Sequence, residues 1–183
     1  MDLPFSTPAG PDARSAFEAS VMRHLDAAYG LARWLARNEQ DAEDVVQEAV
    51  LRAYRFFGGF RGGDARVWLL AIVRNTFYTL RAAAPAPSAH DAFDETLHGG
   101  EDGAPDPETL LARAADAERL RAALARLPAE YREVLVLREF EECSYKEIAA
   151  ITQLKIGTVM SRLARARERL ARCLLEPAAE ASP

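Results

Sequence analysis

Residues 144–165 read SYKEIAAITQLKIGTVMSRLAR, and this stretch decides the fold class of the chain. It opens with the S-x-x-E pattern, in which the side chains of Ser144 and Glu147 satisfy free backbone N–H groups at the start of a helix. Apolar residues continue to a break near Gln153 and resume in a second helix. The apolar residues of that second helix are Ile156, Val159 and Leu163. Two short helices that cross over a shared core form a helix-turn-helix, so the stretch predicts one.

The second helix of this unit is strongly basic. Between Lys155 and Arg172 it carries six basic residues and only Glu168 as an acid, in a chain whose net charge is -5. A helix-turn-helix places the start of its second helix in the major groove of DNA, where side chains reach base edges and phosphates. A basic helix that merely faces solvent is the alternative. The predicted DNA readers are Thr158, Ser161, Arg162 and Arg165.

Other segments of the chain also show helical periodicity. We expect one helix from Phe17 to Leu35, a second that begins with a cap at residues 38–41 and ends at Gly58, and a third from Asp64 to about Arg81. The predicted inward stripe of the second helix is Val46, Val50, Ala53 and Phe57. Further helices are expected from about Leu110 to Leu127, where Pro128 stops the pattern, and over residues 129–140.

No stretch alternates as a half-buried strand should, so the predicted fold is all-α, in two small helical bundles. Residues 82–107 contain four prolines, three glycines and many acidic residues, with almost no aliphatic side chains. Such a composition cannot bury enough surface to order itself, and we expect a flexible acidic linker there. Residues 14–81 and 116–176 each carry a net charge of +2, whereas residues 82–115 carry -6. The chain is therefore expected to be two mildly basic bodies joined by an acidic segment.

Composition also disfavours several classes of protein. No apolar run approaches the roughly 20 residues needed to cross a bilayer, so we expect a cytoplasmic protein without membrane insertion. Cys143 and Cys173 lack the spacing of a zinc site or disulfide framework, and a redox switch at Cys143 is a weaker alternative. The histidines, His24, His90 and His98, lack metal-ligand spacing. With no nucleophile and base pair or phosphate loop, the sequence predicts no enzyme, no cofactor and no metal.

Residues 56–81 interleave aromatic and basic side chains. This mixture suits single-stranded DNA, because exposed rings stack on bases and arginines follow phosphates. Core packing is an equally strong interpretation for Phe57, Trp68 and Phe77, since a bundle of about 65 residues needs large apolar groups.

Three motifs resemble a known family. Residues 127–170 read LPAEYREVLVLREFEECSYKEIAAITQLKIGTVMSRLARARERL and are similar throughout to region 4 of the extracytoplasmic-function (ECF) sigma factors, which reads the minus-35 promoter element. Met160 stands where the family usually has a basic residue, Gln153 replaces a turn glycine, and Thr152 replaces a leucine. The residues that this resemblance places at the minus-35 element are Lys155, Thr158, Met160, Ser161, Arg162 and Arg165.

The N-terminal half resembles region 2 of the same family. Residues 41–55, DAEDVVQEAVLRAYR, look like region 2.2, whose polar face docks on the clamp helices of the polymerase β′ subunit. Residues 60–81, FRGGDARVWLLAIVRNTFYTLR, resemble regions 2.3 and 2.4, which read the minus-10 element. The implied polymerase-binding residues are Asp41, Asp44, Gln47, Glu48 and Arg52. The implied minus-10 residues are Phe56, Phe57, Phe60, Arg61, Trp68, Arg74, Asn75, Tyr78 and Arg81.

The resemblance implies a sigma factor that binds core RNA polymerase through the β′ clamp helices and the β flap, reads promoter DNA and commonly has an anti-sigma factor. A stand-alone helix-turn-helix regulator is the alternative, and it should bind duplex operator DNA without polymerase. The expected boundaries are a flexible N-terminus over 1–14, region 2 over 15–81, the linker over 82–107, region 4 over 108–175 and a tail over 176–183.

Overall fold

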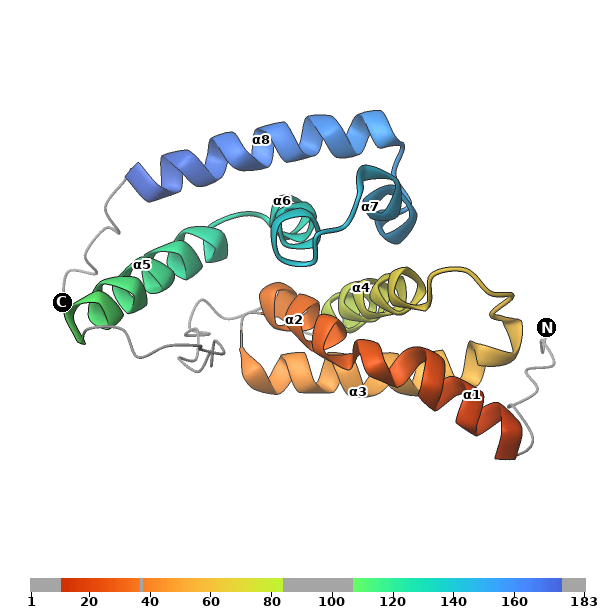
Figure 1. The fold of residues 1–183 in the computed structure, drawn as a ribbon. Coiled ribbons are helices and arrows are strands. Elements are labelled where there is room, and N and C mark those ends of the chain that lie inside the picture. The colour runs from red at the N-terminus through yellow and green to blue at the C-terminus, as the bar shows by residue number, and fades with distance from the viewer. Residues whose placement is uncertain (1–10, 37, 84–106, 176–183) are drawn as a thin grey trace.

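The computed structural model describes residues 11–36, 38–83 and 107–175, and Figure 1 shows two groups of helices stacked on each other. The N-terminal bundle consists of α1 (Pro11–Val21), η1 (Met22–His24), α2 (Leu25–Ala36), α3 (Glu39–Phe56), η2 (Phe57–Gly59) and α4 (Ala65–Ala83). The C-terminal bundle consists of α5 (Pro107–Ala125), α6 (Ala129–Leu135), the π-helical turn η3 (Val136–Phe140), α7 (Tyr145–Thr152) and α8 (Ile156–Leu175). The described residues contain no strand, and the predicted all-α fold is confirmed.

The first predicted helix is two helices. The short 3-10 turn η1 separates α1 from α2, and α1 already begins at Pro11, before the expected boundary at residue 15. The turn lets each part pack on a different surface: the Phe17 ring meets the Tyr54 and Phe57 rings edge to face, whereas α2 packs along α3 and α4. The apolar residues Phe17, Val21, Ala28, Ala32 and Leu35 of this segment are nevertheless buried, as a helix facing the core requires.

Helix α3 begins as predicted but is rotated. The Asn38 side chain accepts a hydrogen bond from the Asp41 backbone N–H at 2.8 Å, which caps the helix. Its fully buried residues are Ala42, Val45, Ala49 and Ala53, whereas Val46, Val50 and Phe57 of the predicted stripe are partly buried and pack against the edge of the same core. Adjacent valines leave the phase ambiguous from sequence. Burying the alanines lets α3 approach its neighbours closely, and the larger side chains cover the flanks.

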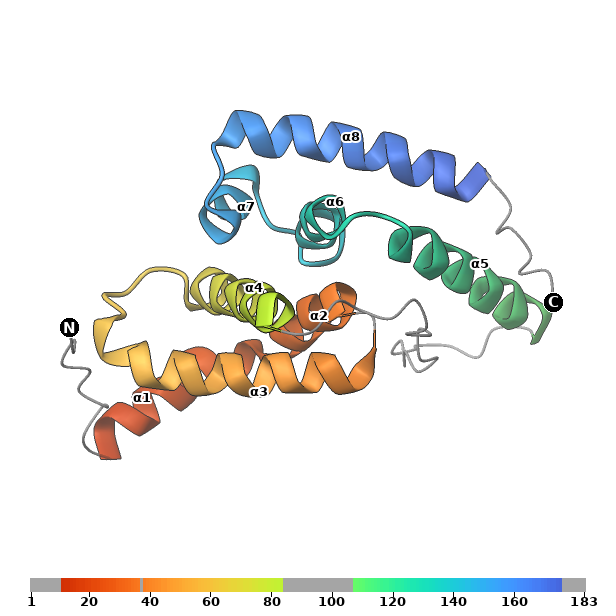
Figure 2. The ribbon, with the colours of Figure 1, turned by 180° about the vertical axis from the view of Figure 1, so that it is seen from behind.

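The C-terminal bundle is organised around α8. Figure 2 shows this helix lying across α5, α6 and α7 as a long outer element. Pro128 stands at the N-cap of α6, as the predicted stop between two helices requires. Helix α4 continues two residues beyond the expected end at Arg81, and residues 84–106 of the predicted linker lie outside the described residues.

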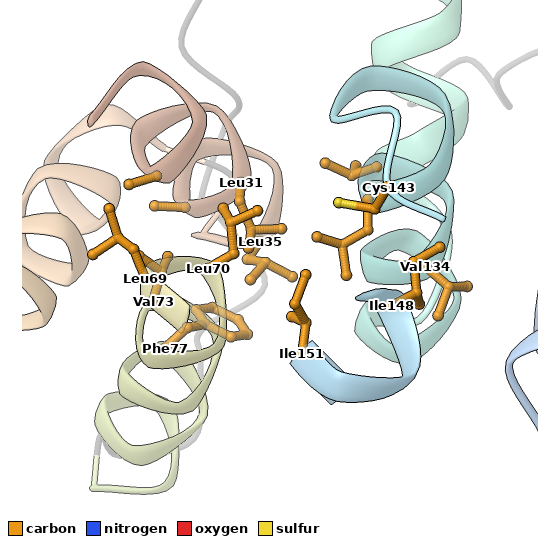
Figure 3. Packing of buried hydrophobic residues seen from close by; sticks show 14 of the residues in the cluster. Leu31, Leu35, Leu69, Leu70, Val73, Phe77, Val134, Cys143, Ile148 and Ile151 are labelled. Atoms are coloured by element: carbon orange, nitrogen blue, oxygen red, sulfur yellow. The ribbon is translucent and has the colours of Figure 1, made fainter. Parts of the chain in front are cut away.

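The two bundles share one apolar core. Helices α2 and α4 form the face of the N-terminal bundle that meets α6 and α7. Figure 3 shows Leu70 and Phe77 of α4 pointing toward Ile151 of α7, and the sulfur of Cys143 pointing toward α2. The labelled residues of this core are Leu31, Leu35, Leu69, Leu70, Val73, Phe77, Val134, Cys143, Ile148 and Ile151. Contact between the bundles is therefore apolar at its centre.

Candidate nucleic-acid interface

The helix-turn-helix has the local geometry that its sequence predicts. The Ser144 backbone N–H donates to the Glu147 carboxylate at 2.6 Å, and the Glu147 backbone N–H donates to the Ser144 hydroxyl oxygen at 3.2 Å. This reciprocal capping box starts α7, and hydrogen bonds from the Ser144 hydroxyl and backbone N–H lower the pKa of Glu147 because they favour its charged carboxylate. Gln153 ends the helix in the left-handed region with a φ of 57°, and α8 follows from Ile156.

Thr152 and Gln153 stand where the family usually has a leucine and a glycine, and the local structure accommodates both. The hydroxyl of buried Thr152 donates to the Ile148 carbonyl at 2.6 Å, so no buried donor is left unsatisfied there. The left-handed Gln153 makes the turn that a glycine would make more easily.

The start of α8 exposes most of the predicted minus-35 residues. The helix buries Val159, Leu163 and Ala166 against the rest of the bundle. Ile156, which we expected on this buried face, is 43% exposed because it occupies the first position of the helix. The exposed members of the predicted set are Lys155, Thr158, Met160, Ser161 and Arg165. Arg162 differs, because it is half-buried and turned toward α6.

The loop predicted to contact the minus-10 element carries a cluster of aromatic side chains, part of which is exposed to solvent. The Phe60 ring lies 4.9 Å from the Trp68 ring and stacks on Phe57 at 5.9 Å, measured between centroids. Phe56 is 45% exposed, and Arg61 is exposed beside it. Phe57 and Trp68 therefore contribute to packing, as the alternative interpretation held, while Phe56 and Arg61 face solvent.

Glycines shape the end of this loop. Gly62 and Gly63 have φ angles of 88° and 102°, which L side chains rarely adopt. Asp64 then caps α4, where its carboxylate accepts from the backbone N–H groups of Arg66 and Val67 at 2.8 and 3.2 Å. The chain thus reverses from the aromatic cluster directly into the helix that carries the remaining minus-10 candidates.

Along α4, Asn75 and Arg81 are exposed, but Arg74 and Tyr78 are held by the other bundle. The Arg74 Nε–H donates to the Glu133 carboxylate at 2.9 Å, and the Tyr78 hydroxyl donates to the same oxygen at 2.9 Å. The Arg74 guanidinium also lies 4.7 Å from the centroid of the Tyr78 ring. Burial, reinforced by the Glu133 charge, raises the pKa of Tyr78 and keeps its hydroxyl protonated.

Glu133 on α6 is the residue that sequence reasoning missed. Its side chain is fully buried, and its second oxygen accepts from Arg74 at 3.3 Å and from Arg162 at 3.4 Å. One carboxylate thus joins two predicted minus-10 residues to a predicted minus-35 residue. A signal was present in the sequence, because Glu133 directly precedes the apolar run VLVL, and a carboxylate in a buried helix needs cationic partners.

A second polar contact joins the bundles. Arg66 of α4 donates through Nη2 to the carbonyl and the carboxylate of Glu141, each at 2.6 Å, and its Nη1 lies 3.7 Å from the Cys143 sulfur. Burial raises the pKa of the Cys143 thiol to about 11, although Arg66 opposes this shift. A neutral, buried thiol is a poor nucleophile, so the geometry disfavours the alternative of a redox switch at Cys143 in this arrangement.

The predicted polymerase-binding face of α3 lies away from the contact between the bundles. Asp41, Asp44 and Gln47 are exposed on it. Glu48 accepts a hydrogen bond from the Arg52 Nε–H at 2.7 Å, so these two side chains form an ion pair along the helix. The face is polar and accessible, and it adjoins the exposed Leu51.

Within the described residues, no cluster of three or more histidine, cysteine or acidic side chains could hold a metal ion. None of the described helices is both long and apolar enough to span a membrane.

Two family models match the chain in order. The model of sigma-70 region 2 matches residues 21–84, and the model of sigma-70 region 4 matches residues 117–170. The first match covers most of the N-terminal bundle, and the second covers the helix-turn-helix with α6.

Whole-chain relatives agree with these models. The RNA polymerase sigma-H factor of Pseudomonas aeruginosa is 35% identical over 168 residues, which cover 88% of this chain and 87% of that protein. The ECF RNA polymerase sigma-E factor of Escherichia coli K12 is 40% identical over 141 residues, which cover 70% of this chain and 71% of that protein.

Solved structures show the same architecture. The sigma factor RpoE of Bartonella quintana, solved in complex with the anti-sigma factor NepR, matches with a TM-score of 0.69 at 27% identity over 90% of this chain and 99% of that chain. CnrH, solved in complex with the cytosolic domain of CnrY, matches with a TM-score of 0.61 at 28% identity over 90% of this chain and 91% of that chain.

Proposed function

Because the chain belongs to the ECF family of RNA polymerase sigma factors, we propose that it docks on core polymerase through α3 and reads two promoter elements with its two bundles. The observation that carries this proposal is the capped helix-turn-helix, which presents four exposed candidate readers on its second helix and a fifth, Lys155, just before it. The chain acts as a non-enzymatic specificity subunit in the cytoplasm, where polymerase and chromosome meet.

The minus-35 element is the ligand of the C-terminal bundle. Arg165 is placed to reach a base edge or phosphate, and Lys155 and the hydroxyls of Thr158 and Ser161 bind the phosphate backbone nearby. Met160, at 52% exposure, offers an apolar contact instead of the positive charge usual in the family. We infer that this position tunes base preference.

The minus-10 element is the ligand of the N-terminal bundle. Phe56 and the partly open ring of Phe60 supply stacking surfaces for unpaired bases, and Arg61 supplies charge for the backbone. Asn75 and Arg81 continue this surface along α4. The packed rings of Phe57 and Trp68 keep the loop in place.

Core polymerase is the partner of α3. Asp41, Asp44 and Gln47 present a polar surface suited to the clamp helices of the β′ subunit, and the C-terminal bundle engages the β flap. The acidic segment over residues 82–107 connects the two regions inside the holoenzyme. An anti-sigma factor is a further expected partner, in keeping with the complexes in which the two similar structures were solved.

Transcription in vitro with purified core polymerase tests this function. Core enzyme supplemented with the chain should initiate at a discrete promoter set, mapped by sequencing transcripts from fragmented genomic DNA. Asp44→Lys should weaken core binding by about tenfold, because it reverses a charge at the centre of the docking face. The matched control is Asp26→Lys, an equal charge reversal at an exposed position of α2.

Two results would contradict the proposal. Transcription no higher than that of core enzyme alone would remove the sigma assignment. Tight, sequence-specific binding of duplex DNA by the free chain, without any effect on polymerase, would favour the stand-alone regulator.

A further inference from the structure

Two DNA-reading surfaces meet on a single buried anion. Arg74 and Tyr78 of the N-terminal bundle and Arg162 of the C-terminal bundle all donate to Glu133. The side chains of Arg74 and Arg162 are only 18% and 24% exposed as a result. A carboxylate presents oxygen acceptors to a guanidinium much as a phosphate does, so Glu133 occupies these cations in place of DNA.

The apolar contact around this carboxylate keeps DNA out. Ile151 of α7 is fully buried and points toward Leu70 and Phe77 of α4 (Figure 3). On the other side, the Trp34 and Phe140 rings lie 5.0 Å apart between centroids. A duplex could reach Arg74 and Arg162 only after these apolar surfaces had separated.

A second ion pair joins the two bundles at the N-terminal end of α4. Arg66 binds both the carbonyl and the carboxylate of Glu141. Gly30 of α2 permits this approach, because a Cβ added there would stand 3.0 Å from the Glu141 carboxylate. The contact between the bundles is thus held by two carboxylates, Glu133 and Glu141, on either side of an apolar centre.

We propose that this arrangement is an autoinhibited form of the protein, in which Glu133 acts as an internal anion that holds the two DNA-reading surfaces against each other. The proposal rests on the proposed function and on the sequence-based prediction that Arg74, Tyr78 and Arg162 also contact DNA. Docking on core polymerase separates the bundles and frees these side chains. The affinity of the free protein for promoter DNA is reduced by the small fraction that is open.

Glu141→Gln tests the proposal without touching a DNA-reading residue. It removes the charge opposite Arg66, and the matched control Glu142→Gln makes the same charge change at the next, exposed residue. Because each variant loses one negative charge, the non-specific attraction to DNA rises equally in Glu141→Gln and Glu142→Gln. We expect Glu141→Gln to raise the affinity of the free protein for a promoter duplex by about tenfold over the control, measured by anisotropy at fixed salt.

Cys143 reports opening independently of DNA. It is 1% exposed and its sulfur points toward α2, so separation of the bundles uncovers it. In a Cys173→Ser background, we expect alkylation of Cys143 by iodoacetamide to be at least several-fold faster in Glu141→Gln than in Glu142→Gln. Equal alkylation rates together with equal DNA affinities would overturn the proposal.

Glu133→Gln tests the central carboxylate, with Glu130→Gln as the control on the exposed face of the same helix. A folded Glu133→Gln variant should show faster Cys143 alkylation than its control. Circular dichroism establishes folding, and if Glu133→Gln does not fold, the Glu141→Gln comparison decides the proposal by itself.

The proposal and the proposed function fail in different ways. With saturating core polymerase, Glu141→Gln should transcribe as the unsubstituted protein does, because docking has already opened it. If the chain supports promoter-specific transcription but neither carboxylate variant opens, autoinhibition is wrong and the sigma function stands. If no transcription occurs with the unsubstituted protein, the function itself fails.

Discussion

Gln153 makes the tight turn between α7 and α8 with a left-handed backbone, at a φ of 57°. A residue with a Cβ is strained there by about 1 kcal/mol, whereas glycine is not. We expect Gln153→Gly to raise the free energy of unfolding by about 0.5 kcal/mol, since the relief of strain exceeds the entropy that glycine gains in the unfolded chain. Urea unfolding followed by circular dichroism measures this.

The same substitution in a helix interior is the control. Gln47 is exposed in the middle of α3, and Gln47→Gly should lower the free energy of unfolding by roughly 0.5–1 kcal/mol. Effects of the same sign at the two positions would show that strain at Gln153 is not the deciding factor.

Cys143 makes stability depend on alkaline pH. Its thiol has a pKa of about 11 in the folded protein, against 9.0 when exposed, so the unfolded chain releases this proton first. The contribution of the thiol to stability is complete below pH 9 and is lost as the pH rises toward 11. We expect Cys143→Ala to flatten the fall of unfolding free energy between pH 9 and 10.5, while Cys173→Ala leaves it unchanged.

At the scale of the element, α8 divides into a buried face, an exposed start that we propose reads DNA, and a basic end. Arg165 is exposed in the middle of the helix, on the same side as the candidate readers at its start. Because a DNA contact by arginine is worth about 1–3 kcal/mol, Arg165→Ala should reduce initiation at minus-35-dependent promoters by about tenfold or more. Transcription at saturating core polymerase provides the measurement.

Arg172→Ala is the matched control for α8. It removes the same charge from an exposed position in the last turn, two turns beyond Arg165. If both variants lose activity equally, the helix contributes only overall charge, and its start has no special role in reading DNA.

At the scale of the whole molecule, the two bundles should unfold together because they share a core. Both tryptophans, Trp34 and Trp68, belong to the N-terminal bundle, so tryptophan fluorescence follows the unfolding of that bundle and, through the Trp34–Phe140 contact, its separation from the other. We expect Ile151→Ala, a change in the C-terminal bundle, to lower the tryptophan-monitored stability by about 2 kcal/mol or more through loss of its contact with α4.

Ile156→Ala is the control, since this isoleucine is 43% exposed on α8. It should leave the tryptophan-monitored transition in place. An unchanged transition in Ile151→Ala would mean that the bundles unfold independently and that their contact contributes little stability.

The sequence by itself determined what depends on near neighbours in the chain. The capping box at Ser144, the cap at Asn38 and the turn at Gln153 were all predictable, because each is set within four residues. Exposure at the start of α8 followed from helical periodicity, which separates Val159 and Leu163 from their polar neighbours. The phase of α3 was not predictable, because adjacent valines fit two orientations.

Which of the predicted DNA-contacting residues face solvent depends on the tertiary structure. Arg74 and Tyr78 lie 59 and 55 residues from Glu133 in the chain, and no local pattern links them. Their meeting depends on how the apolar faces of α2 and α4 fit those of α6 and α7. Because that fit is a property of two assembled surfaces, a sequence can show that a buried carboxylate such as Glu133 needs partners without showing which cations supply them.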